Sequence, residues 1–297
     1  MGIPRKPIIA ICYDFDGTLS PGNMQEYDYI PQLRLSSKKF WKDVEKRAKE
    51  QSSDSILAYM GLMVEKATPT SGVKITKQAF IDYGKTVEFF PGVLDWFQRI
   101  NIYGKRRGAN IQHFIISSGI KEMILGTKIA KKFRKIYASS FMFDQNGVAY
   151  WPALALNFTT KTQFLFRINK GVLDAWDNSK INDYVPMEER PVPFSRIIYV
   201  GDGSTDIPCM KLVKDQRGNS IAVYPPASKK KASAERLLRE NRVNFVAPAN
   251  YNKGHLLDIK VKAIIDKIMA EYKLAKRGVI NREPRKFDKI ACRRSLI

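Results

Sequence analysis

The stretch that decides the fold is IIAICYDFDGTLS, residues 8–20, in which an apolar strand pattern ends in two aspartates one residue apart. Side chains two positions apart in a strand point the same way, so Asp14 and Asp16 are predicted to face one point in space. Two carboxylates held together require nearby positive charge, and Mg²⁺ with its oxygen ligands can supply it. The pattern D-x-D-G is also typical of an ordinary turn, and this stretch alone leaves both interpretations open.

Composition predicts a globular protein of one or two domains, since the chain has 297 residues of which 44% are hydrophobic. The three cysteines, Cys12, Cys209 and Cys292, are too few and too scattered for a disulfide framework or a zinc site. No apolar run is long enough to span a membrane, and the first apolar run ends too early, at Asp14, for a signal peptide. We therefore expect a cytoplasmic protein without a membrane partner.

The formal net charge of +22 is large, with basic clusters at residues 105–107, 229–231 and 293–294. Such a field attracts anions, whether a phosphorylated substrate, a nucleic acid or an acidic partner. The alternative is a solvated basic surface. Because the clusters are dispersed and lack interleaved aromatic residues, nucleic-acid binding is not the favoured interpretation.

Helical periodicity dominates residues 36–84, where three apolar-patterned segments follow one another without an intervening strand pattern. Beyond them, helices and strands alternate. The predicted helices lie at about 93–105, 121–135, 160–171 and 228–240, and the predicted strands at about 111–119, 196–203, 220–224 and 243–247. Asn146-Gly147 between β-prone flanks predicts a hairpin. This alternation indicates an α/β fold with a mostly parallel sheet and right-handed crossovers.

An amphipathic helix is predicted at residues 253–276, with an apolar face made by Leu257, Val261, Ile264, Ile268 and Tyr272. Packing of this face on the domain's own core is favoured over docking in a partner's groove. A basic tail follows from residue 277.

Three predicted strand ends carry polar groups suited to phosphoryl chemistry, and ligands bind at the carboxyl ends of strands in parallel sheets. These groups are Asp14, Asp16 and Thr18 in DFDGT, Ser117 and Ser118 in FIISSG, and Asp202 and Asp206 in VGDGSTD, with Lys161 at the start of a helix between the last two. Individually, Ser117 also fits a helix cap, Lys161 a solvated lysine and GDGSTD a plain turn. Together they supply a carboxylate nucleophile, a neighbouring acid and cations.

The ordered motifs DxDGT, apolar run plus Ser, Lys and GDGxxD resemble those of the haloacid dehalogenase-like (HAD) superfamily of phosphohydrolases. The FFPGV segment, the serine turn and the NGVAYWP hairpin are similar to its phosphoserine phosphatase-like branch. The resemblance covers about residues 7–250. It implies a Rossmann-like core at 1–19 plus 88–250 and a small inserted helical cap at 20–87. Residues 251–297 form a separate C-terminal segment.

The resemblance also implies a role for each site residue. Asp14 would be the nucleophile that forms an aspartyl-phosphate, and Asp16 the general acid and then the base. Mg²⁺ would be bound by Asp14, the backbone carbonyl of Asp16, and Asp202, with Asp206 supporting the metal or orienting Lys161. Ser117, Ser118, Lys161 and Thr18 would bind the phosphoryl oxygens, and the hydroxyl of Thr18 would also fix the loop.

The cap departs from the family pattern at Asn23, nine residues after the nucleophile, where phosphoserine phosphatases typically carry a glutamate. Glu26 is near but at another offset, which argues against phosphoserine as the substrate. The expected function is a Mg²⁺-dependent phosphomonoester phosphatase acting on a small phosphorylated metabolite. The alternatives are a nucleotidase or polynucleotide-end phosphatase, and an inactive nucleic-acid or protein-binding protein on the same fold.

Overall fold

A seven-stranded sheet forms the centre of the computed structural model, which describes residues 6–67, 71–226, 228 and 230–280. The strand order is β4-β3-β2-β1-β5-β6-β7, and every pair is parallel except β3 with β4, which form the hairpin predicted at Asn146-Gly147. The strands are β1 (Ile8–Tyr13), β2 (Asn110–Ile120), β3 (Lys135–Phe143), β4 (Ala149–Leu154), β5 (Ile197–Gly201), β6 (Asn219–Tyr224) and β7 (Phe245–Pro248). The predicted α/β class with a mostly parallel sheet is confirmed.

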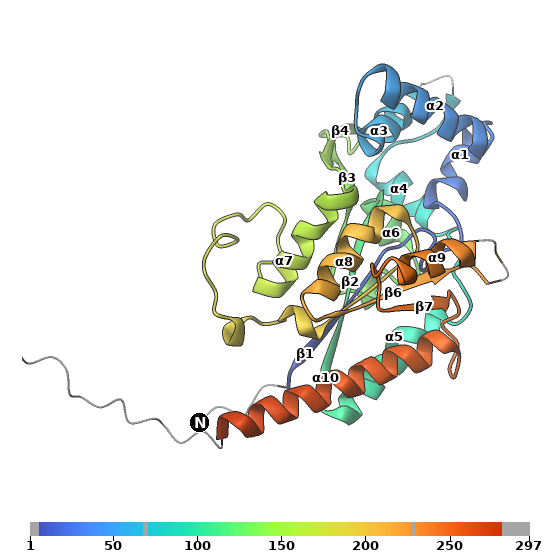
Figure 1. The fold of residues 1–297 in the computed structure, drawn as a ribbon. Coiled ribbons are helices and arrows are strands. Elements are labelled where there is room, and N and C mark those ends of the chain that lie inside the picture. Colours follow the sequence, from blue (N-terminus) through green and yellow to red (C-terminus); the bar gives the residue numbers. More distant parts are fainter. Residues whose placement is uncertain (1–5, 68–70, 227, 229, 281–297) are drawn as a thin grey trace, which may run out of the picture.

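Alternate residues of β1 pack on the two faces of the sheet, as the strand period requires. Ile9 and Ile11 join the core that contains Trp96 of α5, whereas Ala10 and Cys12 join a second core. Helices α5 (Val93–Arg107) and α10 (Leu256–Ile280) contact each other along the first face, and α7 (Thr162–Lys170), α8 (Ile207–Asp215) and α9 (Lys230–Arg239) cover the second (Figure 1). Strand β1 is therefore buried on both faces, and its carboxyl end opens only toward the loops.

The predicted helical run between residues 36 and 84 is confirmed as α2 (Ser37–Glu50), α3 (Ser55–Lys66) and α4 (Lys77–Gly84). A 3₁₀ turn (Met24–Glu26) and the short α1 (Tyr29–Gln32) precede them. Figure 1 shows α1, α2 and α3 beyond the carboxyl end of the sheet. In contrast, α4 packs on α6 (Lys121–Gly126) beside the sheet. We refer to residues 20–87 as the helical cap.

The helix predicted at 121–135 is wrong in length, because α6 ends at Gly126. A Cβ atom at Gly126 would lie 1.8 Å from the carbonyl oxygen of Ile81, so the backbones of α6 and α4 meet where only glycine fits. Thr127 then takes an extended conformation, and its hydroxyl donates to the carbonyl of Ile124 at 2.7 Å. A 3₁₀ turn (Ala130–Lys132) leads directly into β3.

The predicted C-terminal amphipathic helix is confirmed as α10, and its apolar face packs on the protein's own core. Leu257, Val261, Ile264 and Ile268 are buried, and Tyr272 is partly buried against the same core. The tail after residue 280, including Cys292, lies outside the described residues. Within the described part of the chain, Cys12 and Cys209 are free and buried, and no helix has the length and apolar character needed to cross a bilayer.

Candidate active site

The first pair of predicted site residues lies at the carboxyl end of β1, in the centre of the sheet. The backbone N–H of Asp14 donates to the carbonyl of Val200 at 2.9 Å, which ties the end of β1 to β5. Gly17 has φ +74°, and a Cβ atom there would lie 2.2 Å from Oδ2 of Asp202. The glycine of DxDGT therefore permits the turn and the close approach of the third motif to the first.

Asp16 is held in place by the first turn of the helical cap. The backbone N–H of Met24 donates to Oδ1 of Asp16 at 3.0 Å. The thioether sulfur of Met24, which is buried, accepts the N–H of Ile120 at 3.2 Å. A Cβ atom on Gly119 would lie 2.2 Å from Cε of Met24, so this glycine makes room for the contact. Met24 thus links the cap to the first two motifs.

Lys161 lies beneath Asp14 and is completely buried. Its ammonium donates to Oδ1 of Asp206 at 2.8 Å, to Oδ1 of Asp14 at 3.2 Å and to the hydroxyl of Thr205 at 3.3 Å. Burial lowers the pKa of Lys161, but the carboxylates of Asp14 and Asp206 outweigh burial and raise it above its usual value. Lys161 is therefore a permanent cation that offsets the negative charge of Asp14 and Asp206.

Three carboxylates gather at the end of the sheet. Asp14, Asp202 and Asp206 each have one carboxylate oxygen that lies within 4.8 Å of the corresponding oxygens of the other two residues. Oδ1 of Asp206 accepts Lys161 and the hydroxyl of Tyr199, both at 2.8 Å, so this carboxylate is committed to the protein. Asp14 and Asp202 are the members of the cluster that line the adjoining cavity.

The electrostatics of this cluster show a shortage of positive charge. Burial, then Asp206 and Asp202, raise the pKa of Asp14 to about 8 against the pull of Lys161. Burial and Asp206 raise that of Asp202 to about 6, although Lys230 lies 3.7 Å from Oδ2. A divalent cation between Asp14 and Asp202 would remove this deficit, and their carboxylate oxygens suit Mg²⁺. The donor set therefore fits the predicted metal.

Burial and the neighbouring Asp14 raise the pKa of Asp16 well above its usual range. Asp16 accordingly holds a proton more readily than an exposed aspartate does. The two aspartates of DxDGT thus have different environments, with Asp14 paired to a buried ammonium and Asp16 bound only by a backbone N–H.

The predicted phosphate-binding residues are divided between two places. Ser117 and Ser118 line the cavity beside Asp14, and the Ser117 hydroxyl accepts the N–H of Gly119 at 3.0 Å. Thr18 is completely buried and is not among the residues that line the cavity; its carbonyl accepts the hydroxyl of Tyr251 at 2.9 Å. Lys161 also lies outside the cavity lining. The Thr18 hydroxyl has no hydrogen-bond partner among the described residues, so the prediction that it fixes the loop is wrong; the backbone carbonyl of Thr18 makes the hydrogen bond instead.

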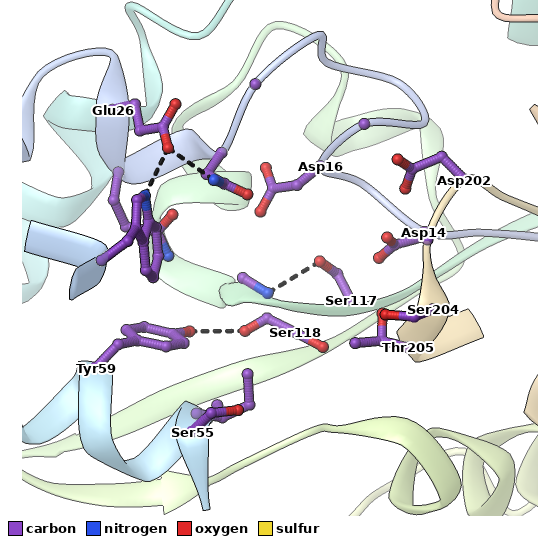
Figure 2. A pocket seen from close by; sticks show the side chains of 18 of the residues that line it. Asp14, Asp16, Glu26, Ser55, Tyr59, Ser117, Ser118, Asp202, Ser204 and Thr205 are labelled. Atoms are coloured by element: carbon purple, nitrogen blue, oxygen red, sulfur yellow. Dashed lines mark hydrogen bonds between the residues drawn. The ribbon is translucent and has the colours of Figure 1, made fainter. Parts of the chain in front are cut away.

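A cavity of about 620 Å³ separates these residues from the helical cap. Figure 2 shows Asp14 and Asp202 on one side, Glu26 and Tyr59 on the opposite side, and Ser118 between them. We call the cap residues that face the carboxylates the cap wall, and they are Gln25, Glu26, Trp41, Glu45, Ser55 and Tyr59. The arrangement can place a phosphoryl group at Asp14 and the rest of a substrate against the cap wall.

Sequence reasoning missed most of the cap wall, because its members come from the Met24–Glu26 turn, α2 and α3 and carry no shared motif. Asn23 and Glu26 could be noticed in the sequence, because Asn23 stands where phosphoserine phosphatases typically carry a glutamate and Glu26 lies nearby. In the structure the Asn23 amide donates to Oε1 of Glu26 at 2.7 Å. Lys230 also lines the cavity, although the sequence did not single it out within its basic cluster at residues 229–231.

A sequence model of the family described as haloacid dehalogenase-like hydrolase matches residues 11–211. An uncharacterized protein of Borreliella burgdorferi is 31% identical, over 84% of this chain and 94% of that protein. Among solved structures, a HAD family hydrolase from Salmonella enterica serovar Typhi has a TM-score of 0.55 at 18% identity, covering 89% of this chain and 73% of that one. A probable phosphoserine phosphatase from Vibrio cholerae has a TM-score of 0.51 at 14% identity, covering 92% of this chain and 69% of that one. These two structures share the fold.

Proposed function

This chain belongs to the haloacid dehalogenase-like hydrolases, and on that premise we propose that it is a Mg²⁺-dependent phosphomonoester phosphatase acting through an aspartyl-phosphate. The observation that carries the proposal is the environment of Asp14. Its carboxylate lines a cavity and lies 3.2 Å from the buried ammonium of Lys161. Lys161 and a bound Mg²⁺ would together favour the ionised form of Asp14, the form that can attack phosphorus. The substrate is proposed to be a small phosphorylated metabolite.

The proposed metal ligands are Asp14, Asp202 and the backbone carbonyl of Asp16. Asp206 is assigned to Lys161, because its Oδ1 already accepts that ammonium and the Tyr199 hydroxyl. When bound, Mg²⁺ would offset the negative charge of the phosphoryl oxygens and of the carboxylates.

In the first step, an oxygen of Asp14 bonds to phosphorus while the bond from phosphorus to the leaving oxygen breaks. Asp16 gives its proton to that oxygen, and its raised pKa suits it to hold the proton until then. Ser117 and Ser118 line the cavity beside Asp14, where their hydroxyl and N–H groups can donate hydrogen bonds to the phosphoryl oxygens. Lys161 favours the ionised form of Asp14 and orients its carboxylate through the hydrogen bond of 3.2 Å.

In the second step, a water molecule attacks the phosphorus of the aspartyl-phosphate. Asp16, now ionised, takes a proton from this water, so the acid of the first step becomes the base of the second. Inorganic phosphate leaves and Asp14 is regenerated. Met24 holds Asp16 through both steps by its N–H. The cap wall limits the entry of bulk water, as closed lids do in general.

The direct test is phosphate release from a generic aryl phosphate with Mg²⁺ and with EDTA. We expect Mg²⁺-dependent turnover that falls by at least about 10³-fold in Asp14→Asn, because the amide cannot act as the nucleophile. The matched control is Asp215→Asn, a carboxylate exposed on α8 and paired with Lys211. Turnover by Asp14→Asn at the rate of the unmodified protein would refute the proposal.

A further inference from the structure

The cavity carries far more negative than positive charge, in a chain whose net charge is +22. Among the described residues that line it, the carboxylates are Asp14, Asp16, Asp202, Glu26 and Glu45, and the cation is Lys230. Lys230 lies on the metal side, 3.7 Å from Asp202. Two carboxylates therefore stay on the cap wall after a divalent cation and Lys230 have balanced the other end.

Glu26 is oriented by the protein yet has an unused oxygen. Its Oε1 accepts the indole N–H of Trp41 at 2.6 Å and the amide of Asn23 at 2.7 Å. Its Oε2 has no hydrogen-bond partner in the described part of the chain, and no described Lys or Arg forms an ion pair with Glu26 or Glu45. A carboxylate fixed in this way presents an acceptor to whatever occupies the cavity.

Two more polar groups of the cavity lining have no hydrogen-bond partner among the described residues. Gln25 is 2% exposed and lines the cavity, and its Oε1 accepts no hydrogen bond. The hydroxyl of Ser118 is also buried without a partner. The hydroxyl of Tyr59 donates its proton to the Ser118 carbonyl at 2.6 Å, so it does not donate to Gln25 or to the Ser118 hydroxyl. The Ser118 hydroxyl can be satisfied by a phosphoryl oxygen, but Oε1 of Gln25 can only accept. Because buried acceptors normally have donors, Gln25 indicates a ligand that brings an N–H or O–H group.

Two aromatic side chains, Trp41 and Tyr59, add to the surface of the cap wall. The rings of Trp41 and Tyr59 meet edge to face with centroids 5.9 Å apart, and both residues line the cavity. Aromatic faces attract cations, and carboxylates beside them strengthen that attraction. In contrast, a carboxylate or a second phosphate on the substrate would find no cation on the cap wall among the described residues.

We propose that the leaving group is a cation, so that the substrate is the phosphomonoester of an amino alcohol that carries no carboxylate. Its ammonium would bind Glu26, with Glu45 and the rings of Trp41 and Tyr59 around it, while its phosphate lies at Asp14. This inference rests on the proposed phosphatase function and names the substrate class of the same site. Glu26 is then the specificity-determining residue.

The experiment compares three series of alkyl monophosphates of two to six carbons that end in an amino, a hydroxyl or a carboxylate group. We expect kcat/KM for the best amino ester to exceed that of its hydroxyl counterpart by about 10- to 100-fold, the worth of a charged hydrogen bond. The carboxylate series should be the poorest. In Glu26→Gln the ratio of amino to hydroxyl ester should fall to near one.

The matched control is Glu50→Gln, which removes a carboxylate of the same helix as Glu45 but outside the cavity, with 58% of its side chain exposed. It should keep the amino preference of the unmodified protein. Thermal unfolding of both variants shows whether either is damaged, and Glu26→Asp, which keeps the charge, should restore part of the preference.

Failure of this inference can be told from failure of the phosphatase function. Hydrolysis of an aryl phosphate with equal kcat/KM for amino and hydroxyl esters overturns the inference and leaves the phosphatase intact. A preference for the carboxylate series also overturns it, as does an amino preference that survives in Glu26→Gln. No hydrolysis of any ester, including the aryl phosphate, refutes the proposed function itself.

Discussion

Replacing Lys161 by methionine tests the buried charge network beneath the site. The ammonium of Lys161 and the carboxylate of Asp206 are both 0% exposed and lie 2.8 Å apart. Removing one partner of a buried ion pair costs about 3–5 kcal/mol, because the other charge stays in a medium of low polarity. The free energy of unfolding of a domain is only about 5–15 kcal/mol. Urea denaturation at pH 7 without metal should therefore show a clearly lower free energy of unfolding for Lys161→Met than for the unmodified protein.

Asp206→Asn in the Lys161→Met background sharpens the test. The second substitution removes the orphaned charge and keeps an acceptor for Tyr199, so the double variant should be more stable than Lys161→Met alone. The deficit of Lys161→Met should also be smaller at pH 5 than at pH 8, because protonation neutralises buried carboxylates.

The control is Lys211→Met, which breaks a pair of nearly the same length, 2.7 Å from Asp215, but with the two side chains 44% and 50% exposed. Surface pairs contribute about 0–1 kcal/mol, so this variant should stay within that range. Equal losses for Lys161→Met and Lys211→Met, or strictly additive losses in the double variant, would refute the electrostatic account of the site.

Three further predictions concern the metal end of the cavity. The metal-free protein should lose thermal stability as pH rises from about 4 to 8. The pKa of Asp14 is about 8 in the folded state and 3.8 ordinarily, so between these values the folded state binds more protons than the unfolded state. Thermal melts with EDTA should show this loss, and melts with Mg²⁺ should show a smaller one. Gly17→Ala should abolish stabilisation by Mg²⁺, because the new Cβ atom would lie 2.2 Å from Oδ2 of Asp202. The control is Gly147→Ala, at a similar φ of +73° but with no atom within 4 Å. It should lower the free energy of unfolding by about 1 kcal/mol and keep the stabilisation by Mg²⁺. Lys230→Gln should lower the Mg²⁺ concentration for half-maximal stabilisation by a few fold, since a cation 3.7 Å from Asp202 competes with the metal; an unchanged or higher concentration in the titration would contradict this.

The strand ends that carry the chemistry could be predicted because their spacing is local. The apolar runs before Asp14 and Asp202 end with their strands, and Ser117 lies near the end of β2, which continues to Ile120. Parallel strands bring these carboxyl ends together. The hairpin at Asn146-Gly147 was equally local, since a tight turn needs residues that accept a positive φ.

What the sequence could not provide depends on contacts between distant segments. The helix after Ser117 stops at Gly126 because the backbone of α4 lies against it, and periodicity within residues 121–135 holds no trace of that contact. In the same way, Tyr59 reaches Ser118 across 59 positions of the chain. The motifs thus identify the phosphoryl end of the site, while the cap wall that faces the leaving group has to be seen in the structure.

Roles within the motifs were also only partly readable. Thr18 follows the two aspartates closely enough to suggest a phosphate contact, yet complete burial and the Tyr251 hydrogen bond place it behind the loop. Lys161 likewise stands beneath Asp14 and outside the cavity lining. Sequence spacing brings a residue near the site but does not decide on which side of the backbone its side chain lies.

The central claim is that Asp14 becomes phosphorylated during turnover, and acid quenching with mass spectrometry tests it most directly. Protein quenched while hydrolysing an aryl phosphate with Mg²⁺ should carry one phosphoryl group on the peptide that contains Asp14. The group should be labile to hydroxylamine, as acyl phosphates are, and should be absent in Asp14→Asn. Turnover with no phosphoryl group on that peptide, or with the group on another residue, would contradict the account.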